Sequence, residues 1–506
     1  MGLSKINNEL GKYRWTICTL VFFATTINYL DRAVISLLKP YLEKEFTWTE
    51  TDYSNIVIAF QVAYAVGMIF VGRFIDKVGT KIGYALSLLI WSISAIAHSF
   101  AKSTLGFIIA RTSLGISEAG NFPAANRTIA EWFPIKERAL ATGIYNSGAN
   151  VGAILAPLVV PWMAVNWGWQ WAFIITGAIG LIWLFFWFVI YEIPAKNRKL
   201  TKEEYDYIHS DKEEVQSTTT SENNSNDKVS WLKLLKYKQT WSFFWGKAIT
   251  DPVWWFWLFW LPAFLDAQYN LVDLQVTLPL AIVYTMASIG SIYGGWLPMK
   301  MISIGWSAER ARRTSMFIYA LFPIPVLFAQ HLGAYNMWCA VIIIGIAAAA
   351  HQAWSANLFT TVSDMFPKKT ISSVTGIGGM AGALGGLLIS KVAGNLFDSY
   401  KIKGIQESFK IAREQGLTEI VNKLQNLGLN EINTIELRKL KDSILIKINT
   451  LDLGAGFEQL KTLQKEIVMK EMTKAYLIMF VICGSAYLLA WIIMKILIPK
   501  SKKVDI

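Results

Sequence analysis

Long apolar runs separated by polar connections recur along nearly the whole chain of 506 residues. A helix needs about 20 residues to cross the hydrocarbon core of a bilayer. Twelve runs are long enough, and each predicts a membrane-spanning helix. The runs cover residues 14–38, 52–72, 82–100, 104–128, 139–163, 169–192, 240–265, 275–299, 314–330, 335–360, 371–396 and 473–498. The pattern predicts an all-α integral membrane protein with twelve transmembrane helices, surrounded by membrane lipids.

The charged residues set the expected orientation of these helices. The formal net charge is +12, but Lys and Arg gather in alternate connections instead of on one soluble face, which argues against a nucleic-acid partner. The basic positions include Lys12, Arg14, Arg73, Lys77, Lys81, Lys136, Arg138, Arg310, Arg312, Arg313, Lys368, Lys369, Lys500, Lys502 and Lys503. By the positive-inside rule, these connections and both termini are expected to be cytoplasmic.

The two halves of the chain match each other. EWFPIKERALATGIYNSGANVGA from residue 131 aligns with DMFPKKTISSVTGIGGMAGALGG from residue 364 at a constant offset of 233. Such a match predicts a transporter built from two homologous six-helix bundles, with its substrate site between them near the midplane. The expected domains are an amino-terminal bundle (1–194), a cytoplasmic linker (195–238), helices 7 to 11 (239–397), an extracytoplasmic insertion (398–472), and helix 12 with a cytoplasmic tail (473–506).

Two segments fall outside the apolar pattern. The linker ends in STTTSENNSNDK, which is too polar to bury and is predicted to be disordered. In the insertion, Leu and Ile recur at helical spacing, which predicts two or more amphipathic helices forming an outer helical cap.

The loop after the second run reads GRFIDKVGTKIG. Its glycines, Gly72 and Gly79, allow a tight turn, while Asp76 is placed to cap the next helix or to pair with Arg73 as a latch. This stretch, which also contains Lys81, resembles the loop motif of the major facilitator superfamily. The resemblance implies the major facilitator fold and an inward-side gate formed by Asp76 and its basic neighbours.

Four further stretches narrow the resemblance to the anion:cation symporter family, and within it to bacterial hexuronate transporters. They are NYLDR at 28–32, RTSLGISEAGNFPAANRTIAEWFP at 111–134, GIYNSGANVGAILAPLVVPW at 143–162 and TDPVWWFWLFWLP at 250–262. The resemblance implies import of glucuronate or galacturonate with protons across the bacterial inner membrane, with alternating access. Galactonate, glucarate or another carboxylate remains an alternative substrate.

Asp31 and Glu118 lie within the apolar runs, where charge is expensive. A carboxyl group held away from water favours its neutral form unless a cation offsets this. Asp31 and Glu118 are therefore expected to carry the coupled protons, and protonating Glu118 would weaken its pairing with Arg111 or another cation. In the alternative reading, Asp31 with Arg32 and Arg111 with Glu118 are ion pairs that only fix helix packing.

Basic residues in the runs are candidates for holding the substrate carboxylate. Tyr29 and Arg32 share one helix face, from which a phenol and a guanidinium can reach an anion. Lys247 is the second candidate, with Asp251 four residues away as its charge partner, unless Lys247 extends to the cytoplasmic surface instead. Pro252 is expected to break this helix.

The remaining expected site residues are polar or aromatic. The repeat offset places His351 opposite Glu118, and Trp354 and Ser355 follow it on the expected wall. Each of these residues has the alternative role of an interhelical hydrogen bond. The amino-terminal half is expected to complete the wall with Tyr64, Asn146 and Asn150.

Other functional classes fit the sequence poorly. The four histidines are far apart and there is no Gly-rich phosphate loop, so we do not expect an enzyme. Cys18, Cys339 and Cys483 have neither disulfide nor metal spacing, and no cofactor beyond the coupling proton is expected. The chain is expected to act as a monomer. A membrane sensor that binds sugar acids without transporting them is the remaining alternative, because the outer insertion offers a surface for a partner.

Overall fold

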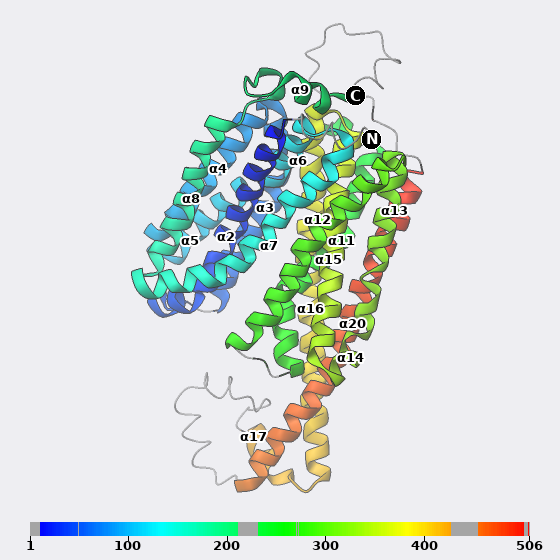
Figure 1. Ribbon diagram of the computed structural model, residues 1–506. Helices are drawn as coiled ribbons and strands as arrows, with labels where there is room; N and C mark the ends of the chain where they lie inside the picture. The colour runs from blue at the N-terminus through cyan, green and yellow to red at the C-terminus, as the bar shows by residue number, and fades with distance from the viewer. Residues whose placement is uncertain are drawn as a thin grey trace.

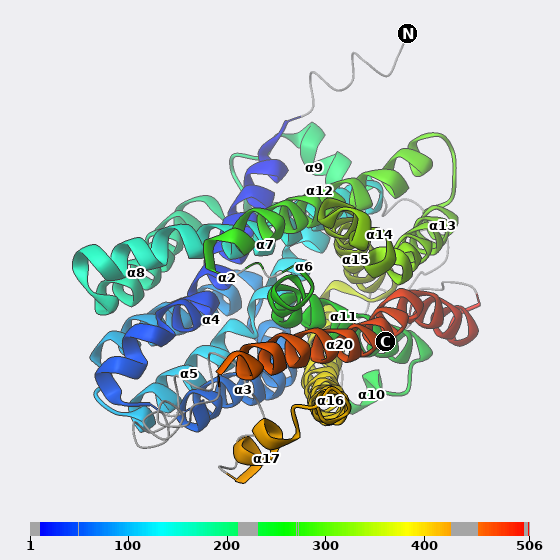
Figure 2. The ribbon, with the colours of Figure 1, turned by 90° about the horizontal axis from the view of Figure 1, so that it is seen from below.

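The structure is a computed structural model that describes residues 11–48, 50–210, 231–269, 271, 273–426, 454–499 and 504. Its helices form two groups, an amino-terminal lobe and a carboxyl-terminal lobe, seen from two directions in Figures 1 and 2. The start of α2 and the end of α20 lie at one end of the molecule, here called the inner end (Figure 1). Helix α17 lies beyond the opposite, outer end.

Seventeen described α-helices make up the fold. The amino-terminal lobe contains α2 (Tyr13–Phe46), α3 (Glu50–Val78), α4 (Thr80–Ala97), α5 (Thr104–Glu118), α6 (Asn121–Trp132), α7 (Ile135–Trp167) and α8 (Trp169–Ile190). The linker contains α9 (Lys202–Ile208) and α10 (Trp231–Leu234). The carboxyl-terminal lobe and its extension contain α11 (Lys238–Tyr269), α12 (Thr277–Ser303), α13 (Ala308–Leu321), α14 (Ala329–Tyr335), α15 (Met337–Met365), α16 (Ile371–Glu414), α17 (Thr418–Asn426) and α20 (Gly454–Leu497).

Ten described helical segments are long and apolar enough to cross a membrane. The other two expected spans correspond to α11 and to the consecutive helices α5 and α6. The fourth span is interrupted at Ala119–Gly120, one turn before Pro123, which lacks the N–H that would bond to the Ala119 carbonyl. Glu118 is consequently the last residue of α5.

The expected break at Pro252 is wrong, because α11 is continuous and contains both Pro252 and Pro262. Proline removes one backbone hydrogen bond and leaves the carbonyl four residues earlier without its partner. That carbonyl belongs to Ala248, and it lies against Gly385 of α16, where an added Cβ would approach it to 2.7 Å. Close packing against a neighbouring glycine therefore accommodates the proline inside a continuous helix.

The duplicated sequences occupy equivalent places in the two lobes. Pro134 directly precedes α7, and its repeat counterpart Pro367 precedes the short turn that leads into α16. Gly143 of α7 packs against the Ser291 carbonyl of α12, and its counterpart Gly376 of α16 packs against the Met68 carbonyl of α3. Each repeat thus supplies a glycine at a close crossing between the two lobes.

The first part of the linker is folded onto the inner end. The Glu204 carboxylate of α9 accepts hydrogen bonds from the backbone N–H groups of Tyr13 and Arg14, and Arg14 also pairs with Glu137 at 2.8 Å. The stretch predicted to be disordered, STTTSENNSNDK, lies outside the described residues.

The insertion continues two of the spans. Helices α16 and α20 each have 44 residues and extend past the outer end, where α17 packs against them. Ile405, Phe409, Val421, Leu424 and Leu460 form a small separate core there. Residues 427–453 of the insertion lie outside the described part of the chain.

Candidate substrate-binding site

A cavity of about 60 Å³ lies between the two lobes near the middle of the molecule. It is lined by Tyr29, Arg32, Tyr64, Met68, Phe122, Asn146, Ala149, Lys247, Asp251, Trp254, Trp255, His351, Gln352, Ser355, Phe359, Thr375, Gly379 and Ala383. Pockets that hold small ligands usually enclose about 300–1,000 Å³. The lobes or the lining side chains must therefore move apart before a sugar-sized molecule fits.

Arg32 is the cation that the amino-terminal lobe contributes to the cavity. Its guanidinium lies over the rings of Tyr29 and Tyr64, at 4.8 and 4.6 Å from their centroids. Behind it, Arg32 Nε and Nη2 each lie 3.1 Å from Glu118 Oε2. Glu118 is fully buried, and its other carboxyl oxygen has no hydrogen-bond partner among the described residues.

Glu118 pairs with a cation as expected, but the two ion pairs of the alternative reading, Asp31 with Arg32 and Arg111 with Glu118, do not form. Glu118 pairs with Arg32 and not with Arg111, whose Nη2 instead donates to the Arg32 backbone carbonyl at 2.9 Å. Asp31 does not pair with Arg32: among the described residues, neither of its buried carboxyl oxygens has a hydrogen-bond partner by the usual geometric criteria. The side chains of Asp31, Glu118 and Arg111 are not part of the cavity wall.

Lys247 is the corresponding cation of the carboxyl-terminal lobe. It is 6% exposed and lines the cavity, so the alternative that it extends to the cytoplasmic surface is wrong. Its ammonium lies 2.7 Å from the Asp251 carboxylate and 4.5 Å from the centre of the Phe359 ring. Each lobe therefore presents one cation to the cavity, the partly buried Arg32 or the buried Lys247, and a carboxylate already neutralises it.

A chain of buried amides joins the lobes beside these cations. Asn146 Nδ2 donates to Gln352 Oε1 at 2.7 Å and to the Ser291 hydroxyl at 3.2 Å. Gln352 Nε2 donates in turn to Asn150 Oδ1 at 3.2 Å. Asn150 thus reaches the cavity only through Gln352, whereas Asn146 lines it directly.

The other polar and aromatic candidates divide between the cavity and the core. Ser355 and His351 line the cavity, and His351 is held by the Tyr487 hydroxyl at 2.7 Å and stacks on Trp254. Trp354 does not line the cavity, because its ring is fully buried against Tyr487.

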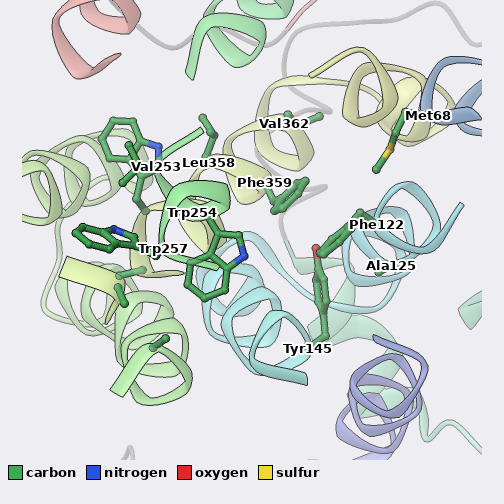
Figure 3. Packing of buried hydrophobic residues seen from close by; sticks show 14 of the residues in the cluster. Met68, Phe122, Ala125, Tyr145, Val253, Trp254, Trp257, Leu358, Phe359 and Val362 are labelled. Atoms are coloured by element: carbon green, nitrogen blue, oxygen red, sulfur yellow. The ribbon is translucent and has the colours of Figure 1, made fainter. Parts of the chain in front are cut away.

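Sequence reasoning missed most of the aromatic lining. Phe122 and Phe359, from opposite lobes, stack with centroids 5.4 Å apart and planes 4° apart, and both are labelled in Figure 3 beside Trp254. Trp254 and Trp255 also line the cavity. Phe122 lies in GNFPAA and the two tryptophans lie in TDPVWW, so the motifs that carried the family resemblance also held the signal for these residues.

Polar contacts between the lobes close the molecule at its inner end, on the inner side of the cavity. Asp76 accepts hydrogen bonds from the backbone N–H groups of Ser372 and Ser373, at 3.1 and 2.7 Å, and therefore caps α16 of the opposite lobe. It also pairs with Arg127 at 3.3 Å. The expected partners, Arg73 and the following helix, are wrong, since Asp76 holds one lobe to the other.

Two other residues of the loop motif have clear structural roles. Gly72 packs so closely against the Ser372 carbonyl that a Cβ would collide with it, and Gly79 has a φ of 88°, a conformation that favours glycine. Lys81 pairs with Glu192 at 2.7 Å on the inner surface. This hydrogen bond lowers the pKa of Glu192.

Replacing Asp76 with asparagine is expected to loosen the inner end. The change removes a charge from the α16 amino-terminus and from Arg127, which should shift the ratio of closed to open molecules toward open by about tenfold. Distances between spin labels at the inner ends of α3 and α16 would measure this shift. The Lys77→Gln variant, an exposed neighbour on α3, should leave the distances unchanged, and an unchanged distribution in Asp76→Asn would contradict the latch.

No group of three or more His, Cys, Asp or Glu side chains in the described part of the chain is arranged to hold a metal ion. The arrangement instead suits an anion, because two cations face one small cavity and each can exchange its own carboxylate for that of a ligand.

Comparison with known proteins places this arrangement in a family. The chain is 32% identical over 387 residues to the hexuronate transporter of Escherichia coli K12, covering 76% of this chain and 88% of that protein. It is 28% identical over 394 residues to the D-galactonate transporter of Escherichia coli O6:H1, covering 77% and 90%.

A solved structure and a family model agree with these relatives. The proton:xylose symporter XylE matches with a TM-score of 0.58 at 15% identity, covering 75% of this chain and 87% of that one, which supports the fold. The family model described as Major Facilitator Superfamily matches residues 21–390. This chain therefore belongs to the Major Facilitator Superfamily, a family of membrane transporters and not of enzymes.

Proposed function

We propose that the protein imports a sugar-acid anion, glucuronate or galacturonate, together with protons, by alternating access across a bacterial inner membrane. The observation that carries the proposal is the pair of cations, the partly buried Arg32 and the buried Lys247, which come from opposite lobes and face one cavity. The similarity to hexuronate and galactonate transporters supports the substrate class. The inner end, where α2 starts and α20 ends, is then the cytoplasmic end.

Arg32 provides the link between substrate and proton. A substrate carboxylate needs a guanidinium that is not already neutralised, and Glu118 occupies Arg32 in the present state. A proton taken up by Glu118 would remove this competitor, so that proton and anion load together. Loss of the proton toward the cytoplasm would return Glu118 to Arg32 and expel the anion.

The remaining lining suits the hydroxyl groups of a sugar acid. Asn146, Gln352 and Ser355 offer donors and acceptors, and the rings of Trp254 and Phe359 offer apolar faces. Asn146 and Gln352 now satisfy each other across the lobes at 2.7 Å. Substrate hydroxyls that replaced this bond would connect the lobes through the ligand, which is how binding would favour a closed, loaded state.

The closed inner end indicates how access would alternate. Asp76 holds α16, and Arg138 of the amino-terminal lobe donates to the Ser363 carbonyl of the other lobe at 2.8 Å. Breaking these contacts while the outer halves of the lobes approach each other would expose the cavity to the cytoplasm.

Galactonate or another organic anion is the second candidate, because the 28% identical relative is named for D-galactonate. The cation pair recognises a carboxylate, whereas the amides and aromatic rings would select among sugar acids.

Counterflow in proteoliposomes separates these possibilities. Vesicles preloaded with one unlabelled sugar acid should take up labelled glucuronate or galacturonate transiently, and an inward proton gradient should drive net accumulation. Galactonate and glucarate serve as competing substrates, and neutral glucose is the control. No counterflow with any sugar acid would contradict transport and favour a sensor. Counterflow with galactonate alone would replace hexuronate as the substrate.

A further inference from the structure

A second and larger cavity, of about 450 Å³, lies at the inner end of the carboxyl-terminal lobe. Helices α13 and α20 form the side of the cavity that faces away from the amino-terminal lobe, at the edge of the carboxyl-terminal lobe (Figures 1 and 2). Its lining residues are Ile135, Ser242, Ala308, Glu309, Arg312, Arg313, Thr314, Met316, Phe317, Thr361, Asp364, Met365, Trp491, Met494, Lys495 and Ile498. None of them lines the substrate cavity.

Arg312 lines this cavity and has one unused hydrogen-bond donor. The residue is 4% exposed, and its Nε pairs with Asp364 while its Nη2 donates to the Ile135 carbonyl at 2.8 Å. Its Nη1 is buried without a hydrogen-bond partner among the described residues. Asp364 cannot fully neutralise Arg312, because it also pairs with Arg138 at 3.5 Å.

Lys495 adds a second positive charge. It forms no ion pair with a carboxylate among the described residues, and its ammonium lies 4.8 Å from the centre of the Trp491 ring. Glu309, the other acidic residue of the lining, pairs with Arg313 at 3.3 Å. An anion at Arg312 Nη1 and Lys495 would therefore meet two cations whose charge the surrounding carboxylates do not balance.

The rest of the wall is apolar and reaches the outer surface of the lobe. Met316, Phe317, Trp491, Met494 and Ile498 supply most of this surface. The Phe317 ring is 38% exposed and packs against Trp491 with centroids 4.8 Å apart. The cavity thus has a cationic inner part and an apolar flank that reaches the surface of the lobe.

We propose that this cavity binds an anionic phospholipid of the cytoplasmic leaflet. The phosphate would accept hydrogen bonds from Arg312 Nη1 and Lys495, and one acyl chain would lie along the Phe317 and Trp491 side. Basic pockets between membrane helices on the cytoplasmic side suit such headgroups. The proposal does not depend on which anion the transporter carries.

The site is adjacent to the contacts that close the inner end. Arg312 belongs to the carboxyl-terminal lobe and holds Ile135 of the other lobe, and Asp364 holds Arg138 in the same way. A phosphate on Arg312 would add a negative charge beside the guanidinium groups of Arg312 and Arg138, which both take part in the contacts between the lobes. The bound lipid therefore favours the closed inner end.

Native mass spectrometry of the full-length protein, incubated with phosphatidylglycerol or with phosphatidylcholine, tests the proposal. The parent protein should retain phosphatidylglycerol. Lys495→Gln should bind it about fivefold more weakly, since one basic residue near a phosphate contributes about that factor. Lys300→Gln, an exposed lysine in the last turn of α12 outside the cavity, should bind like the parent. Ala308→Phe, which narrows the cavity without changing charge, should also lose the lipid.

Three outcomes would overturn the proposal. Equal retention of the two lipids would contradict recognition of an anionic headgroup. Equal binding by Lys495→Gln and Lys300→Gln would contradict the location of the site at Lys495. The third concerns the carboxyl-terminal tail, because the Val504 N–H donates to the Met365 carbonyl of the lining at 2.9 Å. If phosphatidylglycerol binds only after the chain is shortened to Pro499, the tail and not a lipid occupies the cavity.

Discussion

Replacing Glu118 with glutamine is expected to abolish proton-driven accumulation of the sugar acid while leaving counterflow largely intact. Glutamine imitates the protonated carboxyl group, so Arg32 stays available to a substrate carboxylate at every pH. The proton gradient then has no group on which to act. Labelled substrate in proteoliposomes, with and without an inward proton gradient, gives both quantities from one preparation.

The control for this variant is Glu43→Gln. Glu43 lies on the same helix as Arg32 but pairs with Lys39 at 3.1 Å, away from the cavity. The Glu43→Gln variant should accumulate substrate like the parent.

Asp31→Asn tests the second proposed proton carrier, which is buried but does not line the cavity. If both Asp31→Asn and Glu118→Gln still concentrated substrate as steeply as the parent, the assignment of proton coupling to these carboxyl groups would be wrong.

Replacing Arg32 with glutamine is expected to weaken sugar-acid binding by at least a hundredfold. The variant removes the only guanidinium that lines the cavity in the described structure and leaves Glu118 buried without its ion-pair partner. Truncating one partner of a buried, hydrogen-bonded charge pair between a protein and its ligand costs about 2–5 kcal/mol of binding free energy, and a hundredfold loss corresponds to about 2.7 kcal/mol. Equilibrium binding of labelled glucuronate to purified protein measures the loss directly.

Two further variants separate lost recognition from damaged folding. Arg32→Gln combined with Glu118→Gln removes the unpaired charge and should restore thermal stability without restoring binding. Arg32→Lys keeps the charge but not the planar fork of donors, so its binding should be intermediate. Full binding by Arg32→Gln would show that Lys247 alone holds the substrate.

The sequence predicted the two-lobe fold well because the repeat is visible in short motifs. The FP motif occurs in both halves at an offset of 233 and precedes α7 and α16. The TGI motif recurs at the same offset and contains the glycines at the crossings of these helices. The helix starts depend on backbone geometry within one segment, and the repeat itself can be read by aligning the two halves of the sequence. The sequence alone is enough to reveal both.

The partners of the charged residues could not be predicted in the same way. Asp76 lies three residues from Arg73, yet it caps a helix 296 residues away, because the docking of the two lobes decides which N–H groups it meets. Likewise, Arg32 lies next to Asp31 in sequence but points toward Glu118 of another helix. Adjacent residues on a helix point in different directions, so proximity along the chain was a poor guide to pairing.

Pro252 shows a third limit. A proline in a span predicts a break when its surroundings are unknown, but here the backbone of α16 at Gly385 packs against the Ala248 carbonyl that the proline leaves unbonded. That contact is visible only once α11 and α16 are placed side by side.

Helices α16 and α20 continue past the outer end without interruption, and each has 44 residues. A helix of that length spans about 66 Å, roughly twice the thickness of the hydrocarbon core. When the carboxyl-terminal lobe tilts, the tip that these helices form with α17 is therefore displaced much further than the part of the lobe within the membrane. A fluorophore attached to that tip would report the change in lobe orientation during each transport cycle without contacting the substrate pathway.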